Sequence, residues 1–217
     1  MLVLSELKRR AFSEEWHRGL SFDLDQEIRV GNPPFPLHIR GLLPEDPSLL
    51  FCSSNRYLGT CEARERLQRL LFLRADVSRC FVASGPDSFP CAICWLLTHE
   101  DNPLLEVYFK GNLPLLNPGE VLLEFVYVHP QYRGMKLMDW ISKKLFSQAK
   151  LQGATRAIAY VRRGNRVSLA ASDYIGWRPF LEKRVTWRFF RRHVTYNPVP
   201  GKDSVFETLL PAGEGKR

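Results

Sequence analysis

The strongest constraint in this sequence is a strand, turn and helix pattern over residues 119–153. Residues 121–128 are an apolar run with the length and the β-branched and aromatic content of a fully buried strand. The turn His129-Pro130-Gln131-Tyr132-Arg133-Gly134 follows. Apolar residues then recur at helical spacing: Leu137, Ile141, Leu145 and Ala149, with Trp140 beside them. Gly153 ends this predicted helix. A strand that runs into a helix N-terminus gathers unpaired N–H groups, so this turn predicts an anion site.

One residue of the predicted strand does not fit an apolar interior. Strict alternation divides the strand into two faces. One face holds Val121, Leu123, Phe125 and Tyr127, and the other holds Glu120, Leu122, Glu124, Val126 and Val128. Glu124 is therefore an acidic residue in the middle of a buried strand, which makes it a candidate for chemistry.

Residues 128–134, Val-His-Pro-Gln-Tyr-Arg-Gly, resemble the acyl-CoA-binding signature of the GNAT N-acetyltransferase superfamily. In that family a buried strand ends in Val-x-Pro-x-Tyr-Arg-Gly and the pyrophosphate sits on the next helix. The resemblance continues after a predicted strand at residues 155–161, where Asn165 is followed eleven residues later by Gly176-Trp177. It covers roughly residues 36–193, and two motifs in order are more specific than either alone.

The resemblance implies an α+β fold with a mixed, mostly antiparallel central sheet flanked by helices, the GNAT-like acyl-CoA N-acyltransferase fold. It also implies transfer of an acetyl or other acyl group from acyl-CoA to an amine by direct attack in a ternary complex. By the same resemblance, the backbone of the central strand holds the donor at Val126, Tyr127 and Val128. The pantetheine contacts Asn165. The pyrophosphate lies on the residues at the helix start: Arg133, Gly134, Met135, Lys136, Leu137 and Met138.

Three positions depart from the family pattern. Lys136 and Met138 stand where the signature has its two glycines, and Ser172 stands where a tyrosine often protonates the CoA thiolate. If the first residue of the signature is aligned with Gln131 instead of Arg133, Gly134 fills the first glycine position, but the Tyr-Arg-Gly match is lost. Backbone N–H groups survive these replacements, and Lys136 adds a charge. A non-catalytic domain that binds CoA or a protein partner therefore stays open as an alternative.

The catalytic candidates are Glu124 as general base and Tyr174 as general acid. The family's frequent catalytic glutamate aligns with Leu122, and Glu120 and Glu124 flank that position. Burial would raise the pKa of Glu124 toward the operating range. The alternatives are a structural Glu124 paired with an arginine such as Arg188, a Tyr174 that only packs, and an Asn165 that only caps a helix.

The formal net charge of +8 favours anionic partners: CoA phosphates, an acidic carrier protein that delivers the acyl group, nucleic acid or a membrane surface. The run of basic and aromatic residues at 183–193 is a pattern that can bind nucleic acid. As a strand it places most of its charge on one face, so nucleic-acid binding is only a minor hypothesis. We assign no role to His129 beyond structure.

Five cysteines without a secretory signal indicate a reducing cytoplasm, and Cys91 and Cys94 are expected to be buried core residues rather than metal ligands. No apolar run spans a membrane.

The rest of the chain gives expectations for each segment. Residues 1–35 are expected to form an N-terminal helix over 2–20, which could mediate oligomer formation, and a connector. Residues 36–196 form the GNAT-like domain, and 197–217 a C-terminal strand or tail. In the helix at 61–74, leucines are expected to face inward and Arg69 solvent. Further strands are predicted at 37–43, 78–84, 89–99, 184–193 and 204–210, with an extension at 107–109, and short helices at 48–53 and 165–173.

Overall fold

A computed structural model describes residues 2–51, 60–74 and 79–199 of the chain. Six α-helices lie in these residues: α1 Leu2–Ala11, α2 Asp46–Phe51, α3 Thr60–Leu73, α4 Asn102–Phe109, α5 Leu137–Leu151 and α6 Arg166–Ile175. Eight strands lie there as well: β1 Phe12–Asp23, β2 His38–Gly41, β3 Cys80–Ser84, β4 Pro90–Thr98, β5 Glu120–Val128, β6 Arg156–Arg162, β7 Arg178–Arg188 and β8 Arg191–Pro198. The predicted strand at 204–210 and the end of the helix predicted at 48–53 lie outside the described residues.

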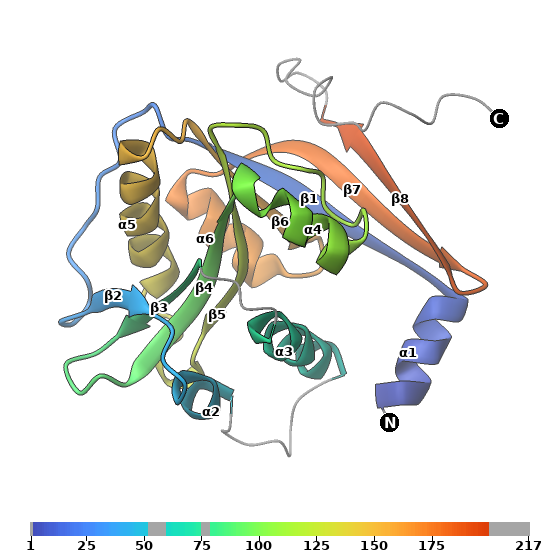
Figure 1. Ribbon diagram of the computed structural model, residues 1–217, viewed down its shortest axis with the longest axis horizontal. Helices are drawn as coiled ribbons and strands as arrows, with labels where there is room; N and C mark the ends of the chain where they lie inside the picture. Colours follow the sequence, from blue (N-terminus) through green and yellow to red (C-terminus); the bar gives the residue numbers. More distant parts are fainter. Residues whose placement is uncertain (1, 52–59, 75–78, 200–217) are drawn as a thin grey trace.

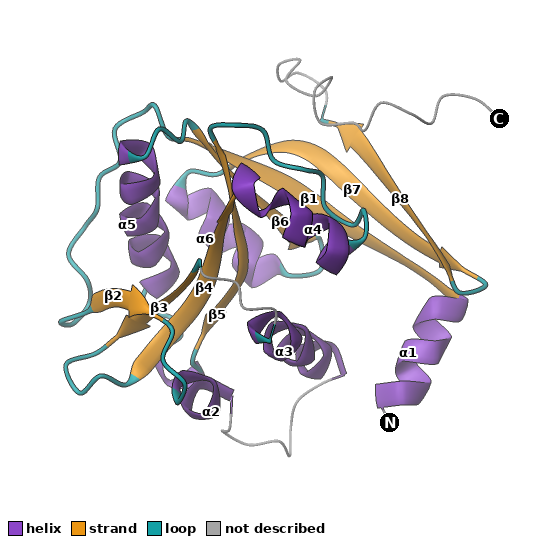
Figure 2. Ribbon diagram, in the orientation of Figure 1, coloured by secondary structure: helices purple, strands orange, loops and turns teal. Residues whose placement is uncertain are grey.

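The strands form one sheet in the order β2-β3-β4-β5-β6-β1-β7-β8 (Figures 1 and 2). Neighbouring strands are antiparallel except β5 and β6, which are parallel. The prediction of a mixed, mostly antiparallel sheet flanked by helices is therefore confirmed. No helix among the described residues is both long and apolar enough to cross a membrane.

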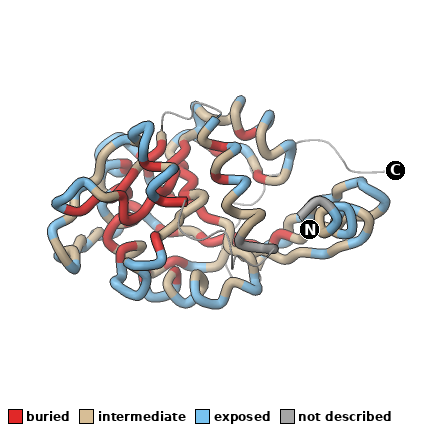
Figure 3. The backbone as a smooth tube through the Cα atoms, turned by 90° about the horizontal axis from the view of Figure 1, so that it is seen from below, coloured by how far each residue is buried: buried red, intermediate tan, exposed pale blue. Residues whose placement is uncertain are grey.

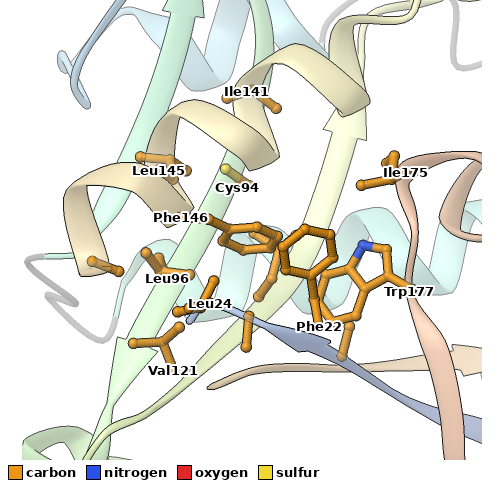
Figure 4. Close-up of a cluster of buried hydrophobic side chains, with 14 of the residues drawn as sticks. Phe22, Leu24, Cys94, Leu96, Val121, Ile141, Leu145, Phe146, Ile175 and Trp177 are labelled. Atoms are coloured by element: carbon orange, nitrogen blue, oxygen red, sulfur yellow. The ribbon is translucent and has the colours of Figure 1, made fainter. Parts of the chain in front are cut away.

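Helices cover both faces of the sheet and bury a separate apolar cluster on each. On one face, α5 packs its predicted stripe and Phe146 against β1, β4 and β5, as Figure 4 shows for Phe22, Cys94 and Val121. On the other face, residues of α2, α3 and α4 surround Trp95 and Phe125. The two clusters hold β5 between them, which is why the run at 121–128 is apolar on both sides.

The prediction of a helix over residues 2–20 is wrong beyond Ala11. Residues 12–23 form β1, which lies inside the sheet between β6 and β7. The reason is that Leu20 and Phe22, two residues apart, are buried in the core, whereas Leu4 and Leu7 on the helical stripe are exposed. The burial therefore follows the period of a strand in this segment.

Two further segments differ from their predicted form. Residues 107–109 are the end of the helix α4 rather than a strand. A capping box between Thr98 and Asp101 starts a short 3-10 helix over His99–Asp101, and α4 follows it directly with Pro103 in its first turn. The strand predicted at 184–193 is two strands, β7 and β8, with a turn at Phe189 and Phe190 that carries no glycine, proline or asparagine.

The helix α3 presents a different face from the one expected. Arg69 is 9% exposed and faces the sheet, whereas Leu67 and Leu71 are exposed. Phe72 rather than these leucines fills the core, where it packs against Trp95, Tyr108 and Phe125. An arginine thus reaches the interior of the protein from α3.

The close packing of β1 on β7 depends on Gly19. A β-carbon at this position would lie 2.6 Å from Cγ of the buried Leu181 and 3.2 Å from the ring of Phe180. A larger residue must therefore displace the side chains of Leu181 and Phe180 or the strand that carries them.

We predict that Gly19→Ala lowers the free energy of unfolding by about 1–3 kcal/mol, because it overpacks the β1–β7 contact. Gly41→Ala is the matched control, since no atom lies within 4 Å of a β-carbon there. Urea unfolding of both variants measures the difference. Equal stability of the two would contradict the packing argument.

Candidate functional site

The parallel strands β5 and β6 separate after a short paired stretch. They pair only at Glu120 with Arg156, at Val121 with Ala157 and at Leu122 with Ile158. Beyond this point β5 stays on β4 as far as Val128, while β6 stays on β1 as far as Arg162. One edge of β5 therefore has no β6 partner over its second half, so its backbone groups must find other partners there.

A β-bulge sets the course of β5 at this point. The β4–β5 register shifts between Ile93 and Trp95, and Phe125 takes a left-handed conformation with φ +52°. Such a bulge bends its strand and reverses the alternation of its side chains. The predicted faces are therefore wrong after Glu124: Val126 and Val128 join the cluster under α5, and Phe125 and Tyr127 join the opposite one.

Arg69 of α3 holds the bulge from one side. It donates from Nε to the carbonyl oxygen of Phe125 at 3.2 Å and from Nη2 to that of Val126 at 3.3 Å. Its guanidinium also lies over the ring of Tyr127, 5.3 Å from the ring centre, and 3.6 Å from Glu65. Two carbonyl groups that a regular ladder would pair are satisfied by this side chain.

Glu124 lies immediately before the bulge and has no hydrogen bond or ion pair within 4.0 Å among the described residues. Burial raises the pKa of this carboxyl, while the charges of Lys183 and Arg69 oppose the increase and Glu65 adds to it. Arg188, the arginine suggested as a structural partner, lies elsewhere and bonds Ser13 and Glu14. By contrast, Glu120 is held by Arg156 at 3.1 Å and by Asn117.

Beyond Glu124, the same face of the sheet carries further polar groups. Lys183 of β7 is 2% exposed, donates to the carbonyl oxygen of Asn112 at 3.1 Å and lies over the ring of Tyr160. The hydroxyl of Tyr160 and Nδ1 of His17 are buried and have no hydrogen-bond partner in the part of the chain that the structure describes. Burial and the charges of Lys183, Arg162 and Arg64 lower the pKa of His17 to about 3, so this imidazole is neutral.

The predicted anion site lies at the start of α5, and residues 133–136 of the turn are exposed. Gly134 has φ +81° and Lys136 has φ +58°, so the chain curls tightly before the helix. Curled turns of this kind direct N–H groups toward a common point, and the first N–H groups of α5 have no partner within the helix. Lys136 stands in the slot of the first signature glycine and adopts the conformation that glycine favours.

Two side chains border this turn, which we call the cradle (residues 133–138). Arg133 donates from Nε to the carbonyl oxygen of Val128 at 3.2 Å. Lys136 donates from Nζ to the hydroxyl of Tyr174 at 2.9 Å and lies over its ring. Tyr174 is 62% exposed, whereas the neighbouring Ser172 is buried. The structure thus brings Tyr174 of α6 to the cradle.

The other residues discussed from the sequence take part in helix capping or in packing. Asn165 caps α6, where its side chain accepts a hydrogen bond from the Ser168 backbone at 3.1 Å. His129 is buried beside Phe89 and Tyr132. Cys91 and Cys94 are buried, as expected, and burial raises the pKa of both thiols. The described residues contain no group of three or more potential metal ligands.

A shallow pocket of about 350 Å³ lies away from the cradle, between the end of β1, residues 26–29 and the end of α6. Its lining includes Lys143 and Arg178 and none of the predicted site residues. We therefore do not assign it to the site.

Sequence reasoning missed Arg69 and Lys183. Both are basic residues in charge-rich segments, so composition alone indicates solvent exposure for each. The available signal for Lys183 is its place at an inward position, between Leu181 and Val185, of a strand whose alternate residues are buried. For Arg69 the signal is its spacing of three from Phe72, the residue that fills the core.

No protein-family model and no curated protein matches the sequence. Solved structures match the fold. A GCN5-related N-acetyltransferase from Sphaerobacter thermophilus aligns with TM-score 0.52 and 13% identity over 93% of this chain and 58% of that chain. A glucosamine N-acetyltransferase region of a fungal multi-domain β-N-acetylglucosaminidase aligns with TM-score 0.55 and 15% identity over 85% of this chain and 22% of that chain.

A GNAT-family acetyltransferase from Colwellia psychrerythraea also aligns, with TM-score 0.50 and 14% identity over 84% of this chain and 59% of that chain. The chain covers less than two thirds of the length of each of these three structures. The protein therefore has the fold of the GNAT N-acetyltransferases, as the resemblance of residues 128–134 to the family signature implies.

We predict that Arg69→Met lowers the free energy of unfolding by about 2–4 kcal/mol, because two backbone carbonyls at the bulge lose their charged donor. Arg74→Met is the control, since Arg74 is exposed at the end of α3 and should change stability by less than about 0.5 kcal/mol. Chemical denaturation measures both. A silent Arg69→Met would mean that the bulge does not need this arginine.

Proposed function

We propose that this protein is an N-acyltransferase that moves an acetyl or other acyl group from acyl-CoA to an amine. The observation that carries the proposal is Glu124, a half-buried carboxyl with no ion pair within 4.0 Å among the described residues, on the strand that separates from its parallel neighbour. A carboxylate withdrawn from water is normally paired, because desolvation is costly. An unpaired one beside an open strand edge is suited to accept a proton.

The donor has a matching site along β5 and the cradle. The edge of β5 without a β6 partner offers the donor's amide chain backbone groups of Val126, Tyr127 and Val128 other than the carbonyl oxygens of Val126 and Val128. Those two oxygens already accept hydrogen bonds from Arg69 and Arg133. The first N–H groups of α5, with Arg133 and Lys136, offer donors and charge to phosphates. The fit rests on the outward-facing turn and on the left-handed conformations of Gly134 and Lys136. The bound acyl-CoA would supply the thioester.

In this proposal side chains of the protein transfer the protons and position the reacting groups. The carboxylate of Glu124 accepts a proton from the ammonium group of the acceptor, directly or through water, which leaves the amine able to attack. Lys183 and Arg69 limit the rise in its pKa and so keep part of the carboxyl ionised at neutral pH. Tyr174, held by Lys136, is the candidate donor of a proton to the departing thiolate.

A second candidate donor is an acyl group on an acidic carrier protein, which the net charge of +8 favours. Assays with acyl-CoA and with acylated carrier protein, followed by thiol release over a panel of amines, distinguish the two. Binding of CoA without turnover of any amine would instead favour the non-catalytic alternative.

We predict that Lys136→Glu weakens the binding of CoA at least about tenfold, because a carboxylate replaces a charge-assisted donor at the cradle. Lys144→Glu is the matched control, since it makes the same charge change at an exposed position farther along α5. Isothermal titration calorimetry with CoA measures both variants. Equal affinities would move the phosphate site away from the cradle.

We predict that Glu124→Gln lowers kcat by about 10²–10⁴-fold, the usual contribution of a general base, and leaves the affinity for CoA unchanged. Steady-state thiol release measures the first effect and calorimetry the second. Full activity in this variant would return Glu124 to a structural role.

We also predict the direction of the pH dependence. A general base works in its ionised form, so kcat/KM should rise with pH through the pKa of Glu124. Because burial raises that pKa, the midpoint should lie above the ordinary carboxyl value of about 4.3. Lys183, Arg69 and Glu65 are the charged groups that face it. A pH–rate profile checks this, and a midpoint at or below about 4.3 would contradict it.

A further inference from the structure

The turn between β7 and β8 has an unusual sequence for its conformation. Phe189 and Phe190 both have positive φ, +49° and +64°, and are 87% and 58% exposed. Two-residue hairpin turns with two left-handed residues strongly favour asparagine, aspartate and glycine, because a β-carbon is strained there. Two phenylalanines are thus unfavourable for the backbone and for solvation. Folding alone does not explain them.

The turn is fixed to the first helix. The backbone N–H of Phe189 donates to the carbonyl oxygen of Ala11 and that of Phe190 to the carbonyl oxygen of Arg10, both at 2.9 Å. These bonds satisfy two of the last carbonyls of α1. The guanidinium of Arg188 lies 3.8 Å from the ring centre of Phe12. The two phenylalanine side chains therefore project from a well-connected base.

We call residues 4–14 and 187–193 the tip surface. It forms one end of the molecule, opposite the end that carries α5 (Figure 1), and few of its residues are buried (Figure 3). Its exposed apolar side chains come from both segments: Leu4, Leu7, Phe12, Phe189 and Phe190. Exposed apolar groups concentrated in this way mark an interaction site.

The charges of the tip surface are mainly positive. Its cations are Lys8, Arg9, Arg10, Arg188, Arg191 and Arg192, and its carboxylates are Glu6 and Glu14. Glu6 already binds Arg9 and Arg10, and Glu14 binds Arg184 and lies 4.0 Å from Arg188. The partner should therefore carry negative charge. A second copy of the same surface would bring like charges together.

We propose that the tip surface docks on an anionic membrane surface, with Phe189 and Phe190 inserted among the lipids and the surrounding cations on the headgroups. Apolar side chains enter the headgroup boundary, and each nearby lysine or arginine adds electrostatic attraction to anionic lipid. Docking by this end leaves the cradle at the start of α5 accessible. The proposal does not depend on the acyltransferase activity.

The test is co-sedimentation of the full chain with phosphatidylcholine vesicles, with and without about one third phosphatidylserine. We expect binding to the vesicles that contain phosphatidylserine and a loss of binding as salt increases. The key variant combines Phe189→Asn with Phe190→Gly, which provides the residues that this turn favours. It should be at least as stable as the wild type and bind at least about tenfold more weakly. Lys8→Glu and Arg191→Glu should each weaken binding at least about fivefold.

Leu151→Asn is the matched control, since Leu151 is 88% exposed on α5, and it should bind as the wild type does. The proposal is overturned if the wild type ignores phosphatidylserine or if the double turn variant binds with unchanged affinity. A preference for single-stranded RNA over vesicles would overturn it as well. So would a dimer in size-exclusion chromatography that the double turn variant abolishes, because the tip would then serve self-association.

Discussion

The structure depends on a local irregularity in β5. A regular parallel pair of β5 and β6 would close the sheet along its full length and leave no backbone free. The bulge at Phe125 prevents this, because it bends β5 after the third pair, and Arg69 satisfies the carbonyls that the bulge exposes. The separation of the strands, the position of Glu124 and the open strand edge all follow from the same bend.

A second feature of the structure is that charged side chains lie in the interior on one face of the sheet. Glu124, Lys183 and Arg69 come from β5, β7 and α3, so they are far apart in the sequence and meet only in the folded protein. Each is costly to bury alone, and their opposite signs offset part of that cost. None of them forms an ion pair with another within 4.0 Å, although Arg69 lies near Glu65. This arrangement keeps the carboxyl available rather than locked.

The sequence predicted the parts of the fold that local patterns encode. The strand, turn and helix around the cradle and the stripe of α5 follow from periodicity and turn residues, and the structure bears them out. Three other features depend on tertiary contacts, which local patterns indicate only weakly. These are the strand at 12–23, the inward Arg69 and the bulge at Phe125. The exposed cradle was predictable, whereas the cations around Glu124 were not, because α3 and β7 bring them in from other parts of the chain.

The place of β1 has a consequence for how the chain reaches this fold. β1 lies far ahead of β6 and β7 in the sequence, yet these strands are its neighbours, so Phe22 pairs with Ala157 and Phe12 with Arg188. Contacts so distant in sequence make folding slow, and most of the chain must leave the ribosome before they can form. Until then the strand that carries Leu20 and Phe22, both buried in the folded protein, has both edges unpaired and is open to wrong pairing.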